Sequence, residues 1–348
     1  MRILAIRPRA LGDVVLVTPA LRALSRGHPD AEIEFVTERR YRPLFEGLEG
    51  VDRVWDLERS ALGTAKLIGA LSRRQYDLAV DFFGNVRSAL ISRACGARRC
   101  AGYALRGRDR AYHVRVPRTL EFCAGDGTRR EYAAATHVRL AEAVGGLSDG
   151  LEARIALPRA ARALAARLLA AAGVREPRRA VGLVAAGTWP AKRWPIGNAA
   201  ALARALMEGG REVILLAGPG EVELARSIRR HAPLTRELPS CGVGELASVI
   251  SELGAVAGTD SGPKHLAASL GVPTITWYGP THPDTWSPPR GPHAWWRTSL
   301  PCRGCDRTVC PHWNCMPELS AEHAAELVLD HLERHERSTS DFGSAARA

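Results

Sequence analysis

The stretch TDSGPKHLAASLGVP, from Thr259 to Pro273, decides the fold of this chain. An apolar run enters it at residues 254–258, and another leaves it at residues 274–278, with a helical pattern between them. A strand, a Gly- and Pro-containing turn, a helix and a second strand make a βαβ unit, which indicates a parallel sheet. In such sheets ligands bind outside the carboxyl ends of the strands, and a helix N-terminus there suits phosphate. We therefore interpret this stretch as part of a nucleotide-diphosphate pocket.

The same alternation of strands and helices runs through both halves of the 348-residue chain. Strand patterns lie near residues 2–7, 32–37, 51–56, 78–81 and 99–102, and again near 180–185, 212–217, 255–258 and 274–278. Helical patterns lie near residues 14–25, 61–73, 87–94 and 132–144, and then near 196–207, 221–230, 244–251 and 263–270. Because the chain is too long for one ordinary core, we expect two Rossmann-like α/β domains that face each other across a cleft.

The domain boundaries follow from composition. We expect an N-terminal domain over residues 1–157, a hinge over 158–179 and a C-terminal domain over 180–318. A last helix over residues 319–337 is expected to pack back toward the N-terminal domain. The polar tail over residues 338–348 is expected to be disordered.

Composition excludes several classes of protein. The chain is 46% apolar and 24% charged, and no apolar run approaches the roughly 20 residues that span a bilayer. The N-terminus has a short strand pattern instead of a signal peptide, so we expect a cytoplasmic protein. The net charge is +11, and residues 98–118 hold seven Arg against Asp109. Such a segment attracts an acidic lipid surface or a phosphorylated substrate, unless it is simply a solvated loop. No aromatic-rich segment accompanies it, which disfavours nucleic acid.

The first strand-to-helix junction carries an acid. Gly12 lets the backbone turn, and Asp13 then stands in the first turn of the helix. Asp13 is either a helix cap or, as a carboxylate facing the cleft, a group that takes a proton from an acceptor hydroxyl. The residues alone leave both interpretations open.

Two loops of the second half carry ligand-binding residue types. After the strand near residues 180–185, one loop presents Thr188 and the adjacent cations Lys192 and Arg193. It is either an ordinary surface loop or a phosphate loop. After the next strand, Glu221 is placed to accept hydrogen bonds from a ribose diol. That turn misses the third Gly of the dinucleotide fingerprint, which disfavours a dehydrogenase.

Four of the eight cysteines are closely spaced: Cys302, Cys305, Cys310 and Cys315. In a cytosolic protein this spacing is compatible with a structural zinc or iron ion, although its four-residue gaps are wider than those of a zinc ribbon. Free buried thiols are the alternative.

Five motifs in order along the chain together resemble glycosyltransferase family 9, the heptosyltransferases of lipopolysaccharide synthesis, which have the GT-B fold. The motifs are Arg7-x4-Gly12-Asp13, Gly187-Thr188 with Lys192-Arg193-Trp194-Pro195, Ala217-Gly218-x2-Glu221, the opening stretch from Thr259 to Pro273, and Tyr278-Gly279-Pro280-Thr281. Lys264 departs from the resemblance, because its slot is often apolar in the family.

The resemblance implies an inverting, metal-independent transfer of a heptose from ADP-heptose to a sugar hydroxyl of the lipopolysaccharide inner core. Asp13 matches the general base. The donor-binding residues implied or predicted are Gly12, Thr188, Lys192, Arg193, Glu221, Asp260, Ser261, Gly262 and His265. No cofactor is expected for the reaction itself.

The expected partners are an ADP-sugar, an anionic lipid A or Kdo-type glycolipid and the inner-leaflet surface, where the protein would associate peripherally. Two alternatives stay open. One is another GT-B nucleotide-sugar enzyme, such as one with a different donor or an epimerase. The other is a non-catalytic anion- or lipid-binding protein driven by the Arg-rich segment.

Overall fold

A computed structural model describes residues 1–118, 121–124, 127–185, 187–218 and 220–345. The chain divides into two compact units, Met1–Arg159 and Ala160–Ala348. Two loop residues of the predicted motifs, Ala186 and Pro219, lie outside the described residues.

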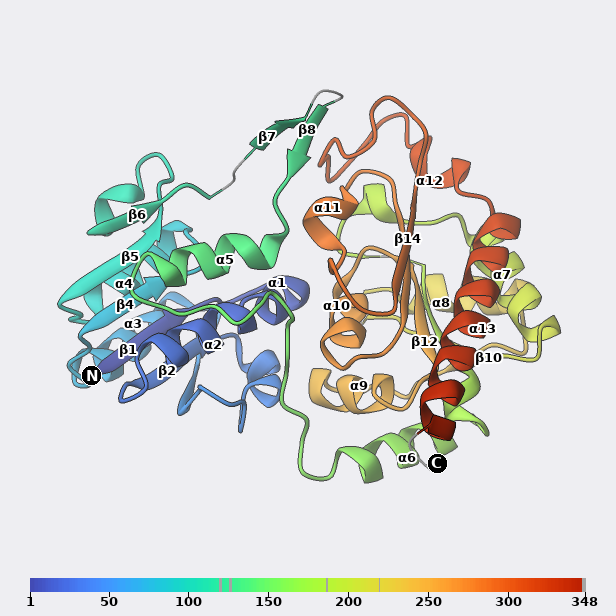
Figure 1. Cartoon of the computed structure of the whole chain (residues 1–348), viewed down its shortest axis with the longest axis horizontal. Helices are drawn as coiled ribbons and strands as arrows, with labels where there is room; N and C mark the ends of the chain where they lie inside the picture. Colours follow the sequence, from blue (N-terminus) through green and yellow to red (C-terminus); the bar gives the residue numbers. More distant parts are fainter. Residues whose placement is uncertain (119–120, 125–126, 186, 219, 346–348) are drawn as a thin grey trace. The chain divides into compact units, whose positions relative to one another are not determined.

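The first unit contains a six-stranded parallel sheet in the order β3-β2-β1-β4-β5-β6 (Figure 1). Its strands are β1 (Arg2–Ile6), β2 (Glu32–Thr37), β3 (Arg53–Asp56), β4 (Leu78–Asp81), β5 (Arg99–Tyr103) and β6 (Val114–Val116). Its helices are α1 (Leu11–Leu16), α2 (Thr18–Gly27), α3 (Ala61–Ser72), α4 (Val86–Ala94) and α5 (Ala133–Glu142), with 3-10 turns η1 (Arg39–Leu44) and η2 (Asp109–Ala111). An antiparallel pair, β7 (Glu121–Ala124) and β8 (Gly127–Arg130), stands apart from the sheet.

The second unit repeats this order as β11-β10-β9-β12-β13-β14, again with parallel pairing throughout. Its strands are β9 (Ala180–Val184), β10 (Glu212–Leu215), β11 (Arg236–Glu237), β12 (Ala255–Thr259), β13 (Thr274–Tyr278) and β14 (His293–Arg297). Its helices are α6 (Ala161–Ala171), α7 (Ile196–Glu208), α8 (Val222–His231), α9 (Val243–Ile250), α10 (Gly262–Ser269), α11 (Pro283–Trp286), α12 (Cys315–Glu318) and α13 (Ala321–Ala345), with η3 (Pro177–Arg179) and η4 (Pro190–Lys192).

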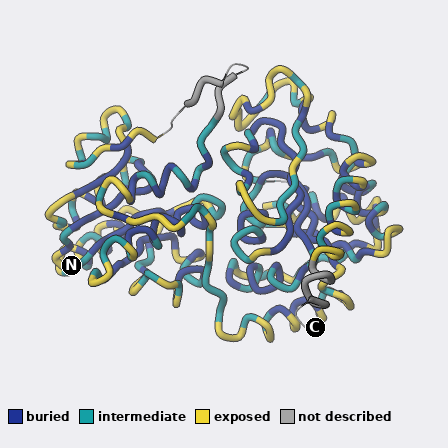
Figure 2. The backbone as a smooth tube through the Cα atoms, viewed as in Figure 1, coloured by how far each residue is buried: buried dark blue, intermediate teal, exposed yellow. Residues whose placement is uncertain are grey.

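These two sheets confirm the predicted α/β class, and each has its core between strands and helices. The central strands read as continuous apolar runs because both faces of a parallel sheet are covered, and Figure 2 shows them buried within each unit. In both sheets the strand order reverses beside the first strand of the unit, between β1 and β4 and between β9 and β12. The carboxyl ends at such a reversal are where ligands bind in this architecture.

The predicted hinge is a packed helix. Of residues 158–179, α6 takes up the first half and packs against α9, where Arg167 lies 3.1 Å from Glu245. The segment belongs to the second unit because the unit boundary falls between Arg159 and Ala160.

The last helix also differs from expectation. Ala324, Val328 and Leu332 of α13 form an apolar stripe that belongs to the core of the second unit, next to α7 (Figure 1). Arg211 holds Glu336 of the same helix through two hydrogen bonds. This apolar stripe is buried in the second unit, and the expected packing toward the N-terminal domain stays a prediction. Residues 338–345, for which disorder was expected, continue α13. Residues 346–348 lie outside the described part.

Candidate functional site

The second unit brings three predicted loops to one edge of its sheet. Glu221 follows β10, Lys192 follows β9 and Asp260 follows β12, and these three strands are neighbours. The approach of β12 to β9 depends on Gly258, whose φ is +146° and whose added Cβ would lie 2.0 Å from the Val184 carbonyl oxygen. Only glycine tolerates both that conformation and that contact.

The carboxylate of Asp260 binds two lysines. Lys264 Nζ lies 2.8 Å from its Oδ1, and Lys192 Nζ lies 2.8 Å from its Oδ2. His265 Nε2 lies 3.7 Å from Oδ1. Burial alone would raise the pKa of Asp260, but the charges of the two lysines and the hydrogen bond from His265 hold it well below its usual range. Asp260 is therefore an ionised group enclosed by cations.

Lys264 is almost fully buried, with 2% of its surface exposed. Besides Asp260, its ammonium group donates to the Trp286 carbonyl oxygen at 2.6 Å and to the Tyr278 hydroxyl at 3.2 Å. Burial lowers the pKa of Lys264, and the charge and hydrogen bond of Asp260 oppose that shift. The family departure noted in the sequence is thus an integral part of the site.

Lys192 is the more accessible of the two lysines, with 14% of its side chain exposed. Its ammonium group also donates to the Asp260 carbonyl oxygen at 3.2 Å and lies 4.5 Å from the centre of the Trp189 ring. The loop is anchored by Trp194, which packs on Trp277 at 4.6 Å and donates to the Leu319 carbonyl oxygen. Thr188 and Arg193 lie at exposed positions of the same loop, as a ligand-binding loop requires.

The N-terminus of α10 lies beside these cations. Ser261 is the N-cap residue, Gly262 begins the helix and Pro263 follows it. The Ser261 side chain makes no capping hydrogen bond, and its buried hydroxyl has no hydrogen-bond partner among the described residues. An added Cβ at Gly187 would lie 3.7 Å from the Asp260 carbonyl oxygen, so the two loops are in contact. Free N–H groups, an unpaired hydroxyl and a lysine together suit an anion.

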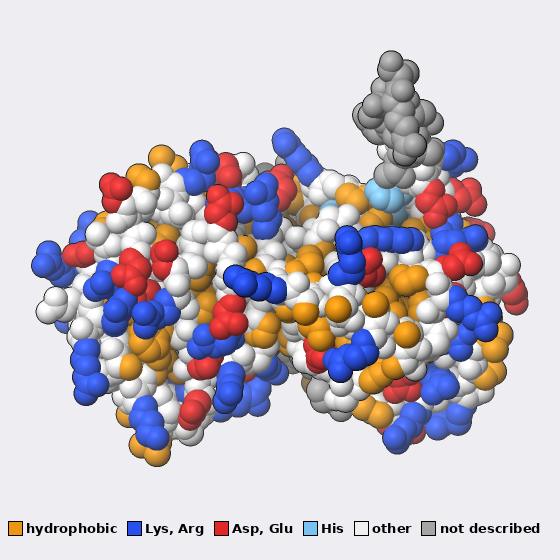
Figure 3. Space-filling model, turned by 90° about the horizontal axis from the view of Figure 1, so that it is seen from below, with side chains coloured by type: hydrophobic (Ala, Val, Ile, Leu, Met, Phe, Trp, Pro, Cys, Tyr) orange, Lys and Arg blue, Asp and Glu red, His pale blue; other side chains and the backbone are white. Residues whose placement is uncertain are grey.

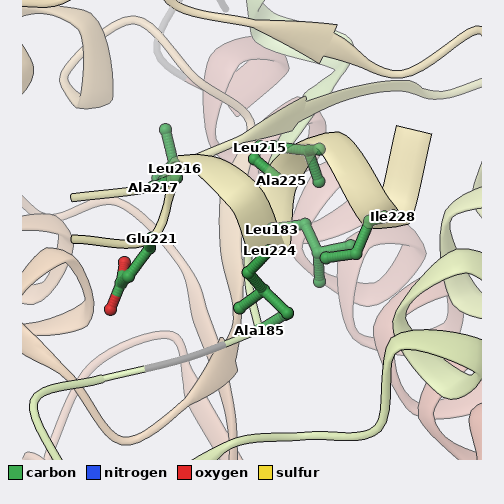
Figure 4. A pocket seen from close by; sticks show the side chains of 9 residues that line it. All are labelled: Leu183, Ala185, Leu215, Leu216, Ala217, Glu221, Leu224, Ala225 and Ile228. Atoms are coloured by element: carbon green, nitrogen blue, oxygen red, sulfur yellow. The ribbon is translucent and has the colours of Figure 1, made fainter. Parts of the chain in front are cut away.

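Glu221 lies at one end of a small apolar pocket (Figure 4). Its Oε2 accepts a hydrogen bond from the Gly218 N–H at 2.8 Å, which fixes the carboxylate. The other lining residues are Leu183, Ala185, Leu215, Leu216, Ala217, Leu224, Ala225 and Ile228. Sequence reasoning found Glu221 but missed this lining, because apolar residues at strand ends look the same as core residues. A fixed carboxylate at the end of β10 suits the hydroxyls of a ribose.

Gly12 and Asp13 lie in the first unit, where they follow β1 at the start of α1. Arg7 NH2 lies 2.5 Å from Asp13 Oδ1, and the Ala10 N–H donates to Asp13 Oδ2 at 3.3 Å. Asp13 therefore does support the helix start, yet 28% of its side chain is exposed. The Asp13 carboxylate can therefore support the start of α1 and still be reached by a second molecule.

The four closely spaced cysteines come after β14, and the last of them begins α12. Among the described residues, no three His, Cys, Asp or Glu side chains are grouped closely enough to hold an ion. Cys315 is buried at the start of α12, whereas Cys302 and Cys305 are exposed. Burial raises the pKa of Cys315 to about 11, and the nearby Cys302 and Cys305 add to the shift. The zinc or iron site stays a prediction that metal analysis of the purified protein can test.

The Arg-rich segment runs through β5, the η2 turn and β6. Arg98 and Arg99 lie at the start of β5, and Arg98 pairs with Asp77. Arg106, Arg110 and the other Arg residues of the segment come after β5, which is five residues or roughly 16 Å long. On the face drawn in Figure 3, basic side chains are likewise interspersed with acidic ones.

Comparisons with known proteins agree with this arrangement. Residues 64–326 match the model of glycosyltransferase family 9 (heptosyltransferase). Lipopolysaccharide heptosyltransferase 1 of Pseudomonas aeruginosa is 27% identical over 90% of this chain and 88% of its own length. Lipopolysaccharide heptosyltransferase 2 of Escherichia coli is 25% identical over 83% and 85%.

Solved structures resemble the chain over nearly its whole length. The Escherichia coli ADP-heptose lipopolysaccharide heptosyltransferase II has a TM-score of 0.77 at 20% identity, covering 97% of this chain and 100% of that one. An Escherichia coli heptosyltransferase solved with ADP has a TM-score of 0.71 at 21% identity, covering 95% and 100%. At these identities the likeness shows the fold, which is the predicted GT-B arrangement of two Rossmann-like units.

Proposed function

The chain belongs to glycosyltransferase family 9, and from this premise we propose that it moves a heptose from ADP-heptose to a sugar hydroxyl of the lipopolysaccharide inner core. We further propose that the transfer inverts the anomeric carbon and needs no metal ion. The observation that carries this proposal is the row of Glu221, Lys192 and Asp260 at the carboxyl ends of three neighbouring strands. The named relatives act on lipopolysaccharide, which supports the acceptor class.

The donor would lie along this row. The adenine would lie outside the carboxyl ends of β9 and β10, and Glu221 would accept hydrogen bonds from the ribose hydroxyls. The diphosphate would then meet Lys192 and the N-terminus of α10, with Thr188, Arg193, Ser261, Gly262 and His265 as further contacts. In this arrangement Asp260 acts by holding Lys192 in place, because an ionised carboxylate repels phosphate.

The transfer can be written as one displacement. Asp13 takes the proton of the acceptor hydroxyl, and that oxygen forms a bond to the anomeric carbon from the face opposite the leaving group. The bond from the anomeric carbon to the diphosphate breaks, and ADP leaves with both bonding electrons. Lys192 and the α10 N-terminus offset the negative charge that develops on the diphosphate, which is the work a divalent ion performs in other enzymes.

We propose that the protein lies in the cytoplasm and associates peripherally with the inner leaflet, where its glycolipid acceptor would be. No helix among the described residues is long and apolar enough to cross a membrane. Helices α3 and α4 expose Leu62 (67%), Val86 (72%) and Leu90 (55%), and Arg87 links the two helix starts through Thr64. Exposed basic residues Lys66, Arg93 and Arg110 lie on α3, on α4 and on the adjoining η2 turn. We define these six exposed residues as the α3–α4 surface, and its apolar and basic chemistry fits an anionic lipid surface.

Calorimetric titration with ADP, UDP and GDP, with and without magnesium, tests the donor assignment. Micromolar ADP binding that needs no magnesium and exceeds UDP and GDP binding is expected. A preference for UDP or GDP would point to a different nucleotide-sugar donor. Absence of any nucleotide binding would remove the donor site and with it the proposed function.

A further inference from the structure

We propose that Lys264 is a positioning residue that gives the donor site its net positive charge by neutralising Asp260, so that the charge of Lys192 remains available to the diphosphate. This inference rests on the proposed function, because it takes the row of Lys192, Asp260 and Glu221 as the donor site. It assigns a role to a residue that departs from the usual family pattern.

The three charged groups of this site do not cancel one another. Asp260 carries one negative charge and binds one lysine on each oxygen, so Asp260, Lys192 and Lys264 together carry one net positive charge. Without Lys264, Asp260 and Lys192 would form a neutral ion pair. A neutral pair attracts a diphosphate far less than a group with one uncompensated positive charge.

The geometry separates the two lysines by role. Lys264 is enclosed by Asp260, the Tyr278 hydroxyl and the Trp286 carbonyl oxygen, and only 3% of its side chain is exposed. It cannot reach a ligand without leaving these partners. Lys192 sits at the mouth of the site, with 14% of its side chain exposed and its ammonium over the Trp189 ring. The buried Lys264 therefore neutralises Asp260, and the more exposed Lys192 carries the positive charge that a diphosphate can contact.

Lysine is rare in this chain, yet two lysines meet at Asp260. The sequence holds 48 Lys and Arg residues, of which only Lys66, Lys192 and Lys264 are Lys. Two of the three bind the same carboxylate. A compact ammonium fits between three acceptors in a buried space, whereas the planar guanidinium of Arg needs a wider one.

The test compares Lys264→Gln with the wild-type chain by titration with ADP, inorganic pyrophosphate and adenosine. Gln is neutral but can still donate a hydrogen bond to the Trp286 carbonyl oxygen, so packing is largely kept. We expect about tenfold weaker binding of ADP and of pyrophosphate, with adenosine affinity unchanged, since adenosine has no phosphate. The matched control is Arg334→Gln, which removes one exposed positive charge from α13 and should leave all three affinities at the wild-type values.

A double variant separates charge from structure. In Asp260→Asn/Lys264→Gln the charge of Lys192 is no longer cancelled, so the net charge returns to one positive unit. Binding of ADP and pyrophosphate should recover at least in part relative to Lys264→Gln. A residue with a merely structural role would give a double variant no better than the single one. If Lys264→Gln does not fold, Lys264→Met and its double with Asp260→Asn serve in its place.

The outcomes are distinct. ADP and pyrophosphate affinities within twofold of wild type in Lys264→Gln would overturn the inference, and so would equal weakening of adenosine binding. A wild-type chain that binds pyrophosphate but not ADP would refute the proposed donor. In that case, the effect of Lys264→Gln on pyrophosphate binding would still test whether Lys264 neutralises Asp260. A wild-type chain that binds neither would overturn both.

Discussion

At the scale of single residues, the geometry of Asp13 is compatible with both roles that the sequence left as alternatives. Its carboxylate accepts from the Ala10 N–H within the first turn of α1 and pairs with Arg7, which is 1% exposed. The buried guanidinium fixes one carboxylate oxygen. A fixed carboxylate with an accessible edge is what a general base needs, because a base must be positioned before it can act.

Asp13→Asn should therefore lower turnover by about 10²–10⁴-fold, the usual contribution of general-base catalysis. The amide keeps an oxygen for the Ala10 N–H but cannot take up the proton. ADP affinity should stay at the wild-type value, because Asp13 is not a donor-binding residue and all of the proposed donor residues except Gly12 lie in the second unit. Single-turnover transfer assays together with ADP titration measure both quantities. Asp30→Asn, at an exposed position, is the matched control. Loss of ADP binding in Asp13→Asn, or normal turnover, would contradict the assignment.

The sequence predicted the residues around Asp260 but not their connections. The spacing of Asp260 and Lys264 places them one helical turn apart, and their pairing could have been expected from that spacing. Lys192 is 68 residues away, and only the adjacency of β9 and β12 brings it to the same carboxylate. Motif spacing carries local information, so a contact made across a strand reversal cannot be obtained from it.

At the scale of elements, the central strands and the edge strand β3 were predictable, and the other edge strands were not. β1, β4, β9 and β12 are apolar runs between turn residues, which is the signal of a strand buried on both faces. The edge strands β6, β11 and β14 were missed. β11 has two residues, and β14 contains His293 and Arg297 within a Pro- and Gly-rich region. Short or mixed segments become strands only because a neighbouring strand offers hydrogen bonds.

The first predicted helix illustrates the opposite error. The apolar periodicity near residues 14–25 continues without interruption, and it predicted one helix. The structure breaks it at Val17 into α1 and α2, because Pro19 has no N–H to donate within a continuous helix. Pro19 is instead accommodated in the first turn of α2, where no donor is needed.

One prediction belongs to the pairing of β13 with β14. His293 faces Thr274 across the two strands, and its Nδ1 lies 2.9 Å from the Thr274 hydroxyl. Burial lowers the pKa of His293 to about 4, and the charges of Lys264 and His331 add to the shift. In the unfolded chain the pKa of His is about 6.5. Between these two values the unfolded state binds a proton that the folded state does not, so stability falls as the pH drops through that window.

His293→Asn should therefore flatten the decline of stability between pH 6.5 and 4.5 relative to the wild-type chain. The difference approaches about 1.4 kcal/mol per pH unit where the slope is steepest. Trp fluorescence during urea unfolding follows the second unit, since seven of the eight Trp residues lie there and only Trp55 lies in the first unit. His323→Asn, exposed on α13, controls for the loss of an unburied His. Equal slopes of unfolding free energy against pH in wild type and His293→Asn would show that His293 does not contribute to the pH dependence of stability.

At the scale of the whole molecule, the net charge of +11 predicted attraction to anions but not where anions would bind. The Arg-rich segment was interpreted as one patch because its residues are close in sequence. The segment instead runs through β5, the η2 turn and β6, so its Arg residues are distributed over three elements. The apolar residues that complete the α3–α4 surface gave no signal in the sequence, because exposed and buried positions of these helices alternate with the same residue types.

The membrane proposal makes a prediction for the intact chain. The wild-type protein should sediment with vesicles that contain anionic lipid, and binding should weaken as salt is added, since basic residues near such a surface contribute about 1 kcal/mol each. Leu62→Ser/Val86→Ser/Leu90→Ser should lower the partition coefficient by at least about tenfold, because each buried CH₂ group contributes roughly 0.8 kcal/mol. Arg93→Glu/Arg110→Glu should weaken binding and reduce its salt dependence. Leu234→Ser, which replaces a 70% exposed Leu of the second unit, is the matched control. ADP affinity should be the same in all of these variants, because they leave the donor residues intact.

Vesicle binding that is unchanged in both multiple variants would exclude the α3–α4 surface as the docking site. Loss of binding only in the Arg variant would show that charge attracts the protein to the membrane without insertion of the apolar side chains.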